Sequence, residues 1–271
     1  MAFRRVRNPD GRMTLGDHLR ELRRRLLIAA IALVIGAIGG WYLYDPVYEH
    51  LTRPLVEIAT ERGDGNSIAL NFAGLTAAFS QRVSIAIFVG VIVSSPVWLF
   101  QLWAFVVPGL TKKERNISLA FIAATVPLFL GGCWFAYQTL PKAVQLLISF
   151  TPDGAVNYPE AALYFSFVTR FILVFGGAFL MPVFLVALNV VRVLPASVMR
   201  RTWRPAFVVI FVFAAIATPT PDPFTMFLLA IPLCVLYLAA LGVSTLLDRR
   251  RAKDRPEWAE QELSDDEAST L

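Results

Sequence analysis

Six stretches of mostly apolar residues alternate with polar stretches along the chain, and their lengths predict the fold. They are Leu26–Tyr44, Val83–Trp103, Ile117–Tyr137, Ala161–Val191, Pro205–Ala217 and Phe224–Leu247. Because an α-helix rises about 1.5 Å per residue, about 20 apolar residues cross the hydrocarbon core of a membrane, which is about 30 Å thick. We therefore predict an all-α, polytopic membrane protein with six transmembrane helices.

Two of the six stretches depart from the expected length. Ala161–Val191 is too long for one straight span, and Pro182 is expected to kink it near its far end. Pro205–Ala217 has thirteen residues, which as a helix cover only about 20 Å. Either the bilayer is thinner there, or Trp203 and its neighbours complete the span.

The segment between the first two spans, from about Asp45 to Gln81, is too long for a simple turn. Apolar residues recur at helical spacing near its end, at Ile68, Phe72, Leu75 and Phe79. This spacing predicts a helix that lies against the bilayer or caps the bundle. Pro46 and Pro54 bracket a second short segment in the same loop.

The positive charges predict the orientation of the bundle. Of the 25 lysines and arginines, twenty lie before the first span or after the second, fourth and sixth spans, whereas the alternate loops hold only Arg53, Arg62 and Lys142. Lysine and arginine are retained on the cytoplasmic side of a membrane, so both termini are predicted to be cytoplasmic and the protein to lie in the cytoplasmic cell membrane. The net charge of +5 is thus explained by topology, and no nucleic-acid partner is expected.

Composition supports the membrane class and divides the chain into three parts. Hydrophobic residues make up 56% of the chain, charged residues 17%, and the mean hydropathy is +0.60, unlike a soluble domain. We predict a cytoplasmic N-terminal segment at 1–25, a six-span membrane domain at 26–247 and a cytoplasmic tail at 248–271. The tail becomes acidic and polar toward its end, which predicts disorder.

The sequence has few groups that could carry chemistry. Cys133 and Cys234 lie inside apolar stretches, which favours packing over a disulfide or a metal site. No phosphate-binding loop, zinc-protease or serine-hydrolase motif occurs, and His18 and His50 lie outside the spans. We therefore expect no enzyme, no cofactor and no metal. The spans contain no Asp or Glu, which weakens the alternative of a secondary transporter for a small solute.

Several ordered motifs together identify a family. They are Asp17–Arg25, with Glu21 among arginines; Ser95–Pro96; Gln101–Leu110; Lys113–Arg115; Thr218–Pro219 followed by Asp222; and Leu229–Pro232. From about residue 14 to residue 247 the chain closely resembles the TatC family of the twin-arginine protein translocase. The resemblance implies a glove-shaped six-helix bundle that recognises twin-arginine signal peptides on folded precursor proteins. It also implies partner subunits of the single-span TatA and TatB types, and a homo-oligomer within a larger complex is expected.

The resemblance implies that the signal peptide binds at the N-terminal segment and at the loop between the second and third spans. The matching positions are Glu21, Phe105 and Glu114, with Leu19, Arg23, Pro96, Gln101, Trp103 and Pro108 around them. Carboxylates suit this ligand, because they accept charge-assisted, bidentate hydrogen bonds from guanidinium groups. Phe105 could pack on the signal's apolar part or on an arginine.

Both acids also have a purely structural interpretation. Glu21 could form a helical ion pair with Arg25, four residues later. Thr111 and Glu114 have the spacing of a capping box at the start of the third span.

A second candidate site lies within the membrane. Leu180 stands where many relatives of the family carry a glutamate, and Met226 where many carry a glutamine. Arg170 lies about nine residues into the fourth span, near mid-membrane. We hypothesise that Arg170 replaces the missing glutamate as the polar contact for a partner helix, near Leu180, Met226 and Asp222. The alternative is that Arg170 extends toward the external surface.

Overall fold

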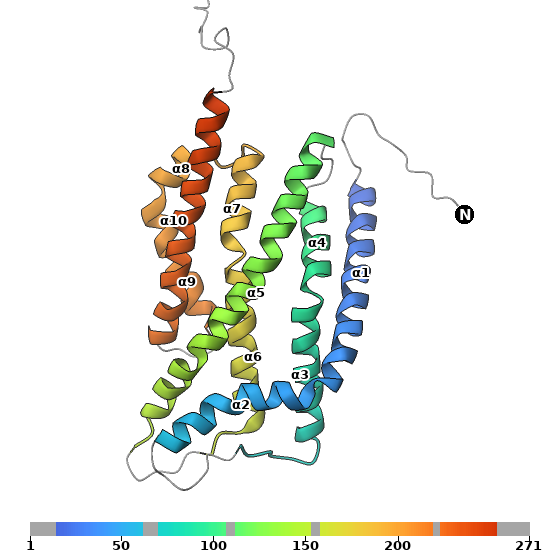
Figure 1. Ribbon diagram of the computed structural model, residues 1–271, viewed down its shortest axis with the longest axis vertical. Helices are drawn as coiled ribbons and strands as arrows, with labels where there is room; N and C mark the ends of the chain where they lie inside the picture. The colour runs from blue at the N-terminus through green and yellow to red at the C-terminus, as the bar shows by residue number, and fades with distance from the viewer. Residues whose placement is uncertain (1–14, 62–69, 107–111, 153–157, 219–222, 254–271) are drawn as a thin grey trace, which may run out of the picture.

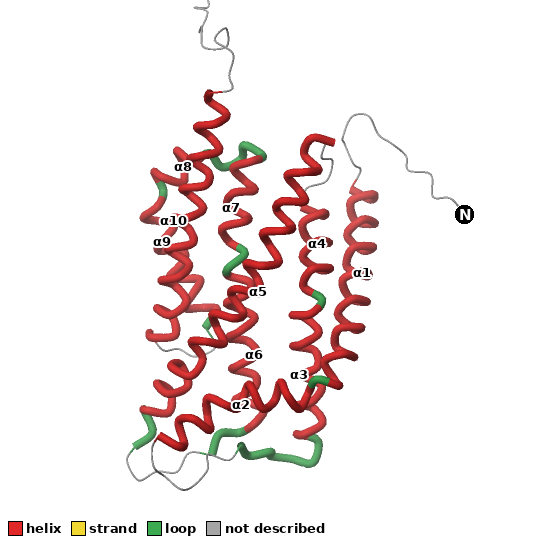
Figure 2. The backbone as a smooth tube through the Cα atoms, viewed as in Figure 1, coloured by secondary structure: helices red, strands yellow, loops and turns green. Residues whose placement is uncertain are grey.

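The computed structural model describes residues 15–61, 70–106, 112–152, 158–218 and 223–253. Within these ranges the chain is almost entirely helical (Figure 2), and the only β-type pairing is an isolated bridge between Asn71 and Glu160. The elements are α1 (Leu15–Tyr42), α2 (Tyr44–Glu61), α3 (Ala77–Val93), α4 (Ser95–Val106), α5 (Lys112–Ser149), α6 (Ala161–Ala178), α7 (Met181–Val190), α8 (Ala196–Arg201), α9 (Trp203–Ala217) and α10 (Pro223–Lys253). The predicted all-α fold is confirmed.

The long helices run side by side and alternate in direction, and α2 crosses the lower end of the bundle (Figure 1). The start of α1 and the end of α10 lie at the opposite, upper end. By length and apolar composition, α1, α6 with α7, and α10 each qualify as a membrane span, and the bent pair α3–α4 makes a fourth. These helices make the chain a multi-pass membrane protein, whereas the count of six spans stays a prediction.

Two spans are broken at the positions of prolines. α6 ends at Ala178 and α7 begins at Met181, with Pro182 in the first turn of α7, as the sequence predicted. The second apolar stretch is also broken, because α3 and α4 meet at an angle of 59° just before Pro96. Because proline has no backbone N–H to donate, a helix next to it already lacks one hydrogen bond, and a break there removes few others.

α9 is the short fifth stretch, and Trp203 is its first residue. Its 15 residues cover about 22 Å. Figure 1 shows that α9 and the start of α10 stop above the level that α5 and α6 reach at the lower end.

Small residues bring pairs of helices into close contact. A methyl group added to Gly36 of α1 would lie 2.9 Å from the carbonyl oxygen of Gly90 in α3, and one added to Gly40 would lie 2.6 Å from that of Ala86. A methyl group on Gly132 of α5 would likewise lie 2.7 Å from the carbonyl oxygen of Phe175 in α6. Small residues hold membrane helices together in this way, by van der Waals contact between backbones.

The core is centred on α6. Phe165, Phe171 and Phe175 are completely or almost completely buried, and neighbouring aromatic rings of α2 and α5 pack on them. Leu180, at the break between α6 and α7, belongs to the same core.

The loop helix between the first two spans is α2, and it includes both Pro46 and Pro54. Its residues Leu51 and Leu55 are buried in the core, and the hydroxyl of Tyr164 in α6 donates a 2.7 Å hydrogen bond to the Leu51 carbonyl. Pro54 has no N–H for the carbonyl of His50, which instead accepts a 3.5 Å hydrogen bond from Tyr137 of α5. α2 is therefore hydrogen-bonded to both α5 and α6.

The helix predicted from Ile68 to Phe79 is wrong for the described residues before α3. Asn71 pairs with the segment before α6 instead, donating to the Pro159 carbonyl at 3.0 Å and accepting from the Ala161 N–H at 2.8 Å. Gly74 then turns the chain with a φ of 101°, a conformation that few side chains tolerate. Local apolar spacing was overridden by this contact between distant segments.

Arg82 joins three helices at the lower end of the bundle. Its guanidinium lies 4.8 Å from the ring centroid of Trp41 in α1 and 4.9 Å from that of Tyr44 in α2, and it donates to the Trp41 carbonyl at 3.5 Å. Cation–π contacts of this kind are stronger where water is excluded. Arg82 thus has partners within the fold.

Candidate functional site

The candidate site begins on the inward face of α1. His18, Glu21, Leu22 and Arg25 are half-buried, whereas Leu19 and the arginines between them are exposed. The half-buried residues follow the spacing i, i+3, i+4, i+7, which places them on one face of the helix. Glu21 is therefore directed toward the bundle rather than into open solvent.

A ring contact attaches this face to α4. The imidazole of His18 stacks on the ring of Phe105, with 4.6 Å between the centroids and 23° between the ring planes. Glu21 follows His18 by one helical turn, so the structure brings Phe105 into the neighbourhood of Glu21. The sequence assigned no role to His18, and its spacing of three residues from Glu21 was the available signal.

Glu21 forms an ion pair with Arg25, as its structural interpretation predicted. Arg25 donates from Nε to Glu21 Oε1 at 3.1 Å, and its Nη2 contacts the same oxygen. The side chains of Arg25 and Glu21 are 20% and 26% exposed, respectively. A half-buried pair is screened less by water and salt than a fully exposed one.

The other described positions matched to signal binding lie on α1 and α4. On α1, Leu19 and Arg23 are exposed and border a shallow groove with Leu22 and Leu26. On α4, Pro96 is exposed at the bend, Gln101 is half-buried and Trp103 is buried. The side chain of Glu114, in the first turn of α5, and all of Pro108 lie outside what the structure describes.

The intramembrane candidates differ in their exposure. Arg170 is exposed on α6, Leu180 is buried, and Met226 of α10 is half-buried and packs on the core. Asp222 lies outside the described residues. Of the three described positions, Arg170 is the one that carries a charge, and that charge is accessible.

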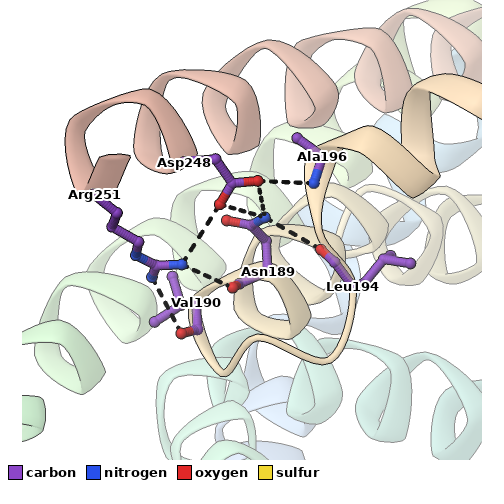
Figure 3. A network of polar contacts seen from close by, with 6 residues as sticks. All are labelled: Asn189, Val190, Leu194, Ala196, Asp248 and Arg251. Atoms are coloured by element: carbon purple, nitrogen blue, oxygen red, sulfur yellow. Dashed lines mark hydrogen bonds and ion pairs between the residues drawn. The ribbon is translucent and has the colours of Figure 1, made fainter. Parts of the chain in front are cut away.

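A polar network that the sequence did not predict joins α7, α8 and α10 (Figure 3). It lies at the end of the bundle where α1 begins (Figure 1). The side-chain amide of Asn189 in α7, itself almost completely buried, donates to both oxygens of Asp248 in α10 at 3.1 Å and to the Leu194 carbonyl at 3.2 Å. The N–H of Ala196, at the start of α8, donates to Asp248 at 2.9 Å. The Asp248 carboxylate thus joins α10 to α7 and α8, and Asn189 holds the loop between them.

Arg251 completes the network from the next turn of α10. It donates to the carbonyls of Asn189 and Val190 at 3.1 Å each, and it lies 3.6 Å from Asp248. The last carbonyls of a helix lack helical donors, and a cation there also interacts favourably with the helix dipole. The signals available in the sequence were one amide in the fourth apolar stretch and one acid before three arginines.

The described residues form a bundle of apolar helices in which α1, α8 and α10 place charged side chains at one end. This arrangement defines a multi-pass, α-helical membrane protein with a charged face at one end.

Comparison with known proteins identifies the family. Residues 17–232 match the family described as "Sec-independent protein translocase protein (TatC)". The chain belongs to the TatC family.

Two relatives match over most of their length. A TatC from Xylanimonas cellulosilytica is 49% identical, over 88% of this chain and 86% of the relative, and one from Rothia mucilaginosa is 37% identical, over 97% and 88%. A crystal structure of the "Twin Arginine Translocase Receptor- TatC" is 34% identical and aligns with a TM-score of 0.72, over 86% of this chain and all of that one.

Proposed function

We propose that the chain is the signal-peptide receptor and core subunit of the twin-arginine translocase, and that it exports folded proteins across the cytoplasmic membrane. The half-buried carboxylate of Glu21 carries the proposal, because it faces the bundle one turn from the stacked rings of His18 and Phe105. A carboxylate in such partial shelter binds a guanidinium more strongly than a carboxylate in open water does. Glu114 is proposed as the second acid, on its match to the family motif.

The proposal includes an orientation and partners. Both termini face the cytoplasm, so that the acids meet signal peptides of precursors made there. The start of α1 and the end of α10 lie at one end of the bundle (Figure 1), and the distribution of lysine and arginine supports the cytoplasmic side for that end. TatA- and TatB-type subunits and further copies of this chain complete the complex. Arg170 offers the polar contact to a partner helix, since it is exposed about 13 Å along α6 from Ala161.

Binding of signal peptides to the full-length protein in lipid nanodiscs tests the function. We expect a peptide with an arginine pair to bind more tightly than one with two lysines, and Glu21→Gln to weaken the former by about tenfold, because charge-assisted hydrogen bonds contribute about 1.5–3 kcal/mol. Glu114→Gln should also weaken it. A peptide carrying a photocrosslinker beside its arginines should label residues near Glu21.

Glu57→Gln is the matched control, because Glu57 forms an ion pair of the same i,i+4 type with Arg53 on α2, at the lower end of the bundle. It should leave binding unchanged. Wild-type affinity in the Glu21→Gln variant, or equal binding of the two peptides, would contradict the proposal.

A further inference from the structure

The Glu21 carboxylate is already occupied by a guanidinium of the same helix. Arg25 approaches it with Nε and Nη2, the same two donors that an arginine of a signal peptide would offer. We infer that Arg25 is a resident competitor: it holds Glu21 in the empty receptor, and an incoming arginine must displace it. This inference rests on the function proposed above.

The geometry provides a route for the exchange. Both donors of Arg25 contact Oε1 of Glu21, and among the described residues no donor contacts Oε2. An incoming guanidinium can first bind Oε2 while Arg25 still holds Oε1. It then takes both oxygens in the bidentate arrangement that planar guanidinium groups favour, and Arg25 leaves.

The exchange keeps the carboxylate paired throughout. Leaving a half-buried charge without a partner is costly, and a resident arginine avoids this in the empty receptor. Arg25 is also the last charged residue before nineteen uncharged ones. A long cationic side chain at this position can turn to the headgroups and water at the membrane surface once it is released.

Arg25 therefore sets a threshold for binding. A ligand has to replace an existing ion pair rather than bind an open acid, so its apparent affinity is reduced by the strength of that pair. The affinity of a peptide with a lysine pair, which carries the same charge, is reduced by the same factor. The resident arginine therefore raises the concentration that either peptide needs, and the preference for the arginine pair comes from the geometry of its pairing with Glu21.

The neighbouring arginines do not have this role. Arg20 lies 3.6 Å from Asp17, and both side chains are largely exposed. Arg24 is exposed on the outward side of α1, and no described residue forms an ion pair with it. Arg24→Gln therefore removes the same charge one residue away without freeing Glu21.

The test measures signal-peptide binding to full-length Arg25→Gln and Arg24→Gln proteins in nanodiscs. An i,i+4 ion pair on an exposed helix would lower the apparent affinity of a competing ligand by about twofold. Because partial burial strengthens the pair, we expect Arg25→Gln to bind the signal peptide about threefold to tenfold more tightly than wild type. Arg24→Gln should change the affinity by less than about twofold, the general effect of removing one repelling charge. The lysine-pair peptide should gain the same factor in Arg25→Gln.

Further variants distinguish a failure of the proposed function from a failure of the resident competitor. The gain in Arg25→Gln should disappear when Glu21→Gln is added, because no carboxylate is then left to free. If Glu21→Gln alone has no effect, the proposed function at this site fails. If Glu21→Gln weakens binding but Arg25→Gln binds no more tightly than Arg24→Gln, only the resident competitor is refuted.

Weaker binding in Arg25→Gln, with an unchanged melting temperature, would also refute the competitor and show that Arg25 positions Glu21. Arg25→Lys provides a second variant that keeps the charge and the fold. It should bind signal peptides with an affinity between those of wild type and Arg25→Gln, because an ammonium forms a weaker, non-planar pair.

Discussion

The arginines of this protein differ in the interactions that their side chains make. Arg25 is paired with a carboxylate, Arg82 is enclosed by two aromatic rings, and Arg251 donates to two helix carbonyls. Arg170 is exposed on an apolar helix, and no described residue forms an ion pair or hydrogen bond with it. A charge near the centre of a membrane costs about 2.5–3.5 kcal/mol on insertion scales unless water or a partner reaches it.

Arg170→Leu tests whether a partner helix supplies that contact. We expect lower export and weaker crosslinking to TatA- and TatB-type subunits, while the isolated chain remains folded, because the substitution removes no ion pair or side-chain hydrogen bond to another described residue. Leu163→Ala, at another exposed position of α6, should leave both readouts unchanged. Unchanged export and crosslinking in Arg170→Leu would contradict the proposed contact and favour extension toward the external surface.

At the scale of helices, α1 depends on its glycines in unequal ways. Gly40 is buried, and a methyl group there would lie 2.6 Å from a backbone oxygen of α3 and 2.9 Å from Cβ of Val89. Gly39, its neighbour, is exposed, and nothing lies within 4 Å of the corresponding position. Substituting each of these two adjacent glycines therefore distinguishes the effect of close packing from the effect of helix propensity.

Gly40→Ala should destabilise the folded protein by about 1–3 kcal/mol, because α1 and α3 must separate to accommodate the methyl group. Gly39→Ala should be neutral or stabilising by up to about 1 kcal/mol, since alanine favours the helix over the unfolded chain. Thermal unfolding in detergent measures both. Equal stability of the two variants would show that the contact between α1 and α3 is looser than described.

The sequence predicted helices well where one stretch was apolar throughout, and poorly where distant segments meet. The break before Pro182 could be predicted from proline chemistry alone. The extent of α2 could not, because Pro46 lies in the first turn, where a missing N–H costs nothing, and Tyr137 compensates for Pro54. At the site, the pair of Glu21 with Arg25 followed from their spacing, whereas the stacking of His18 on Phe105 required the fold.

At the scale of the whole molecule, the alternating helix directions place α2 at one end and the last turn of α10 at the other (Figure 1). Together with the distribution of arginines, this arrangement predicts that α2 faces outward and the end of α10 faces the cytoplasm. The two ends can be tested independently, because both Glu57 and Arg250 are exposed.

Single cysteines at these positions should react differently with a membrane-impermeant thiol reagent. In a variant with Cys133 and Cys234 replaced by alanine, Glu57→Cys should be labelled in intact cells, and Arg250→Cys only after the membrane is permeabilised. The opposite pattern would place Glu21 on the outer surface, where it could not meet newly made precursors.

The network around Asp248 also defines where the chain can be joined to another protein. Asp248 and Arg251 fasten α10 to the carbonyls and amides of the segment from Asn189 to Ala196. A fluorescent reporter fused after Lys253 leaves this fastening intact, whereas a fusion that replaces α10 from Asp248 onward removes it. The last two turns of α10 thus belong to the folded unit, and the shortest version of the protein that keeps its shape must include them.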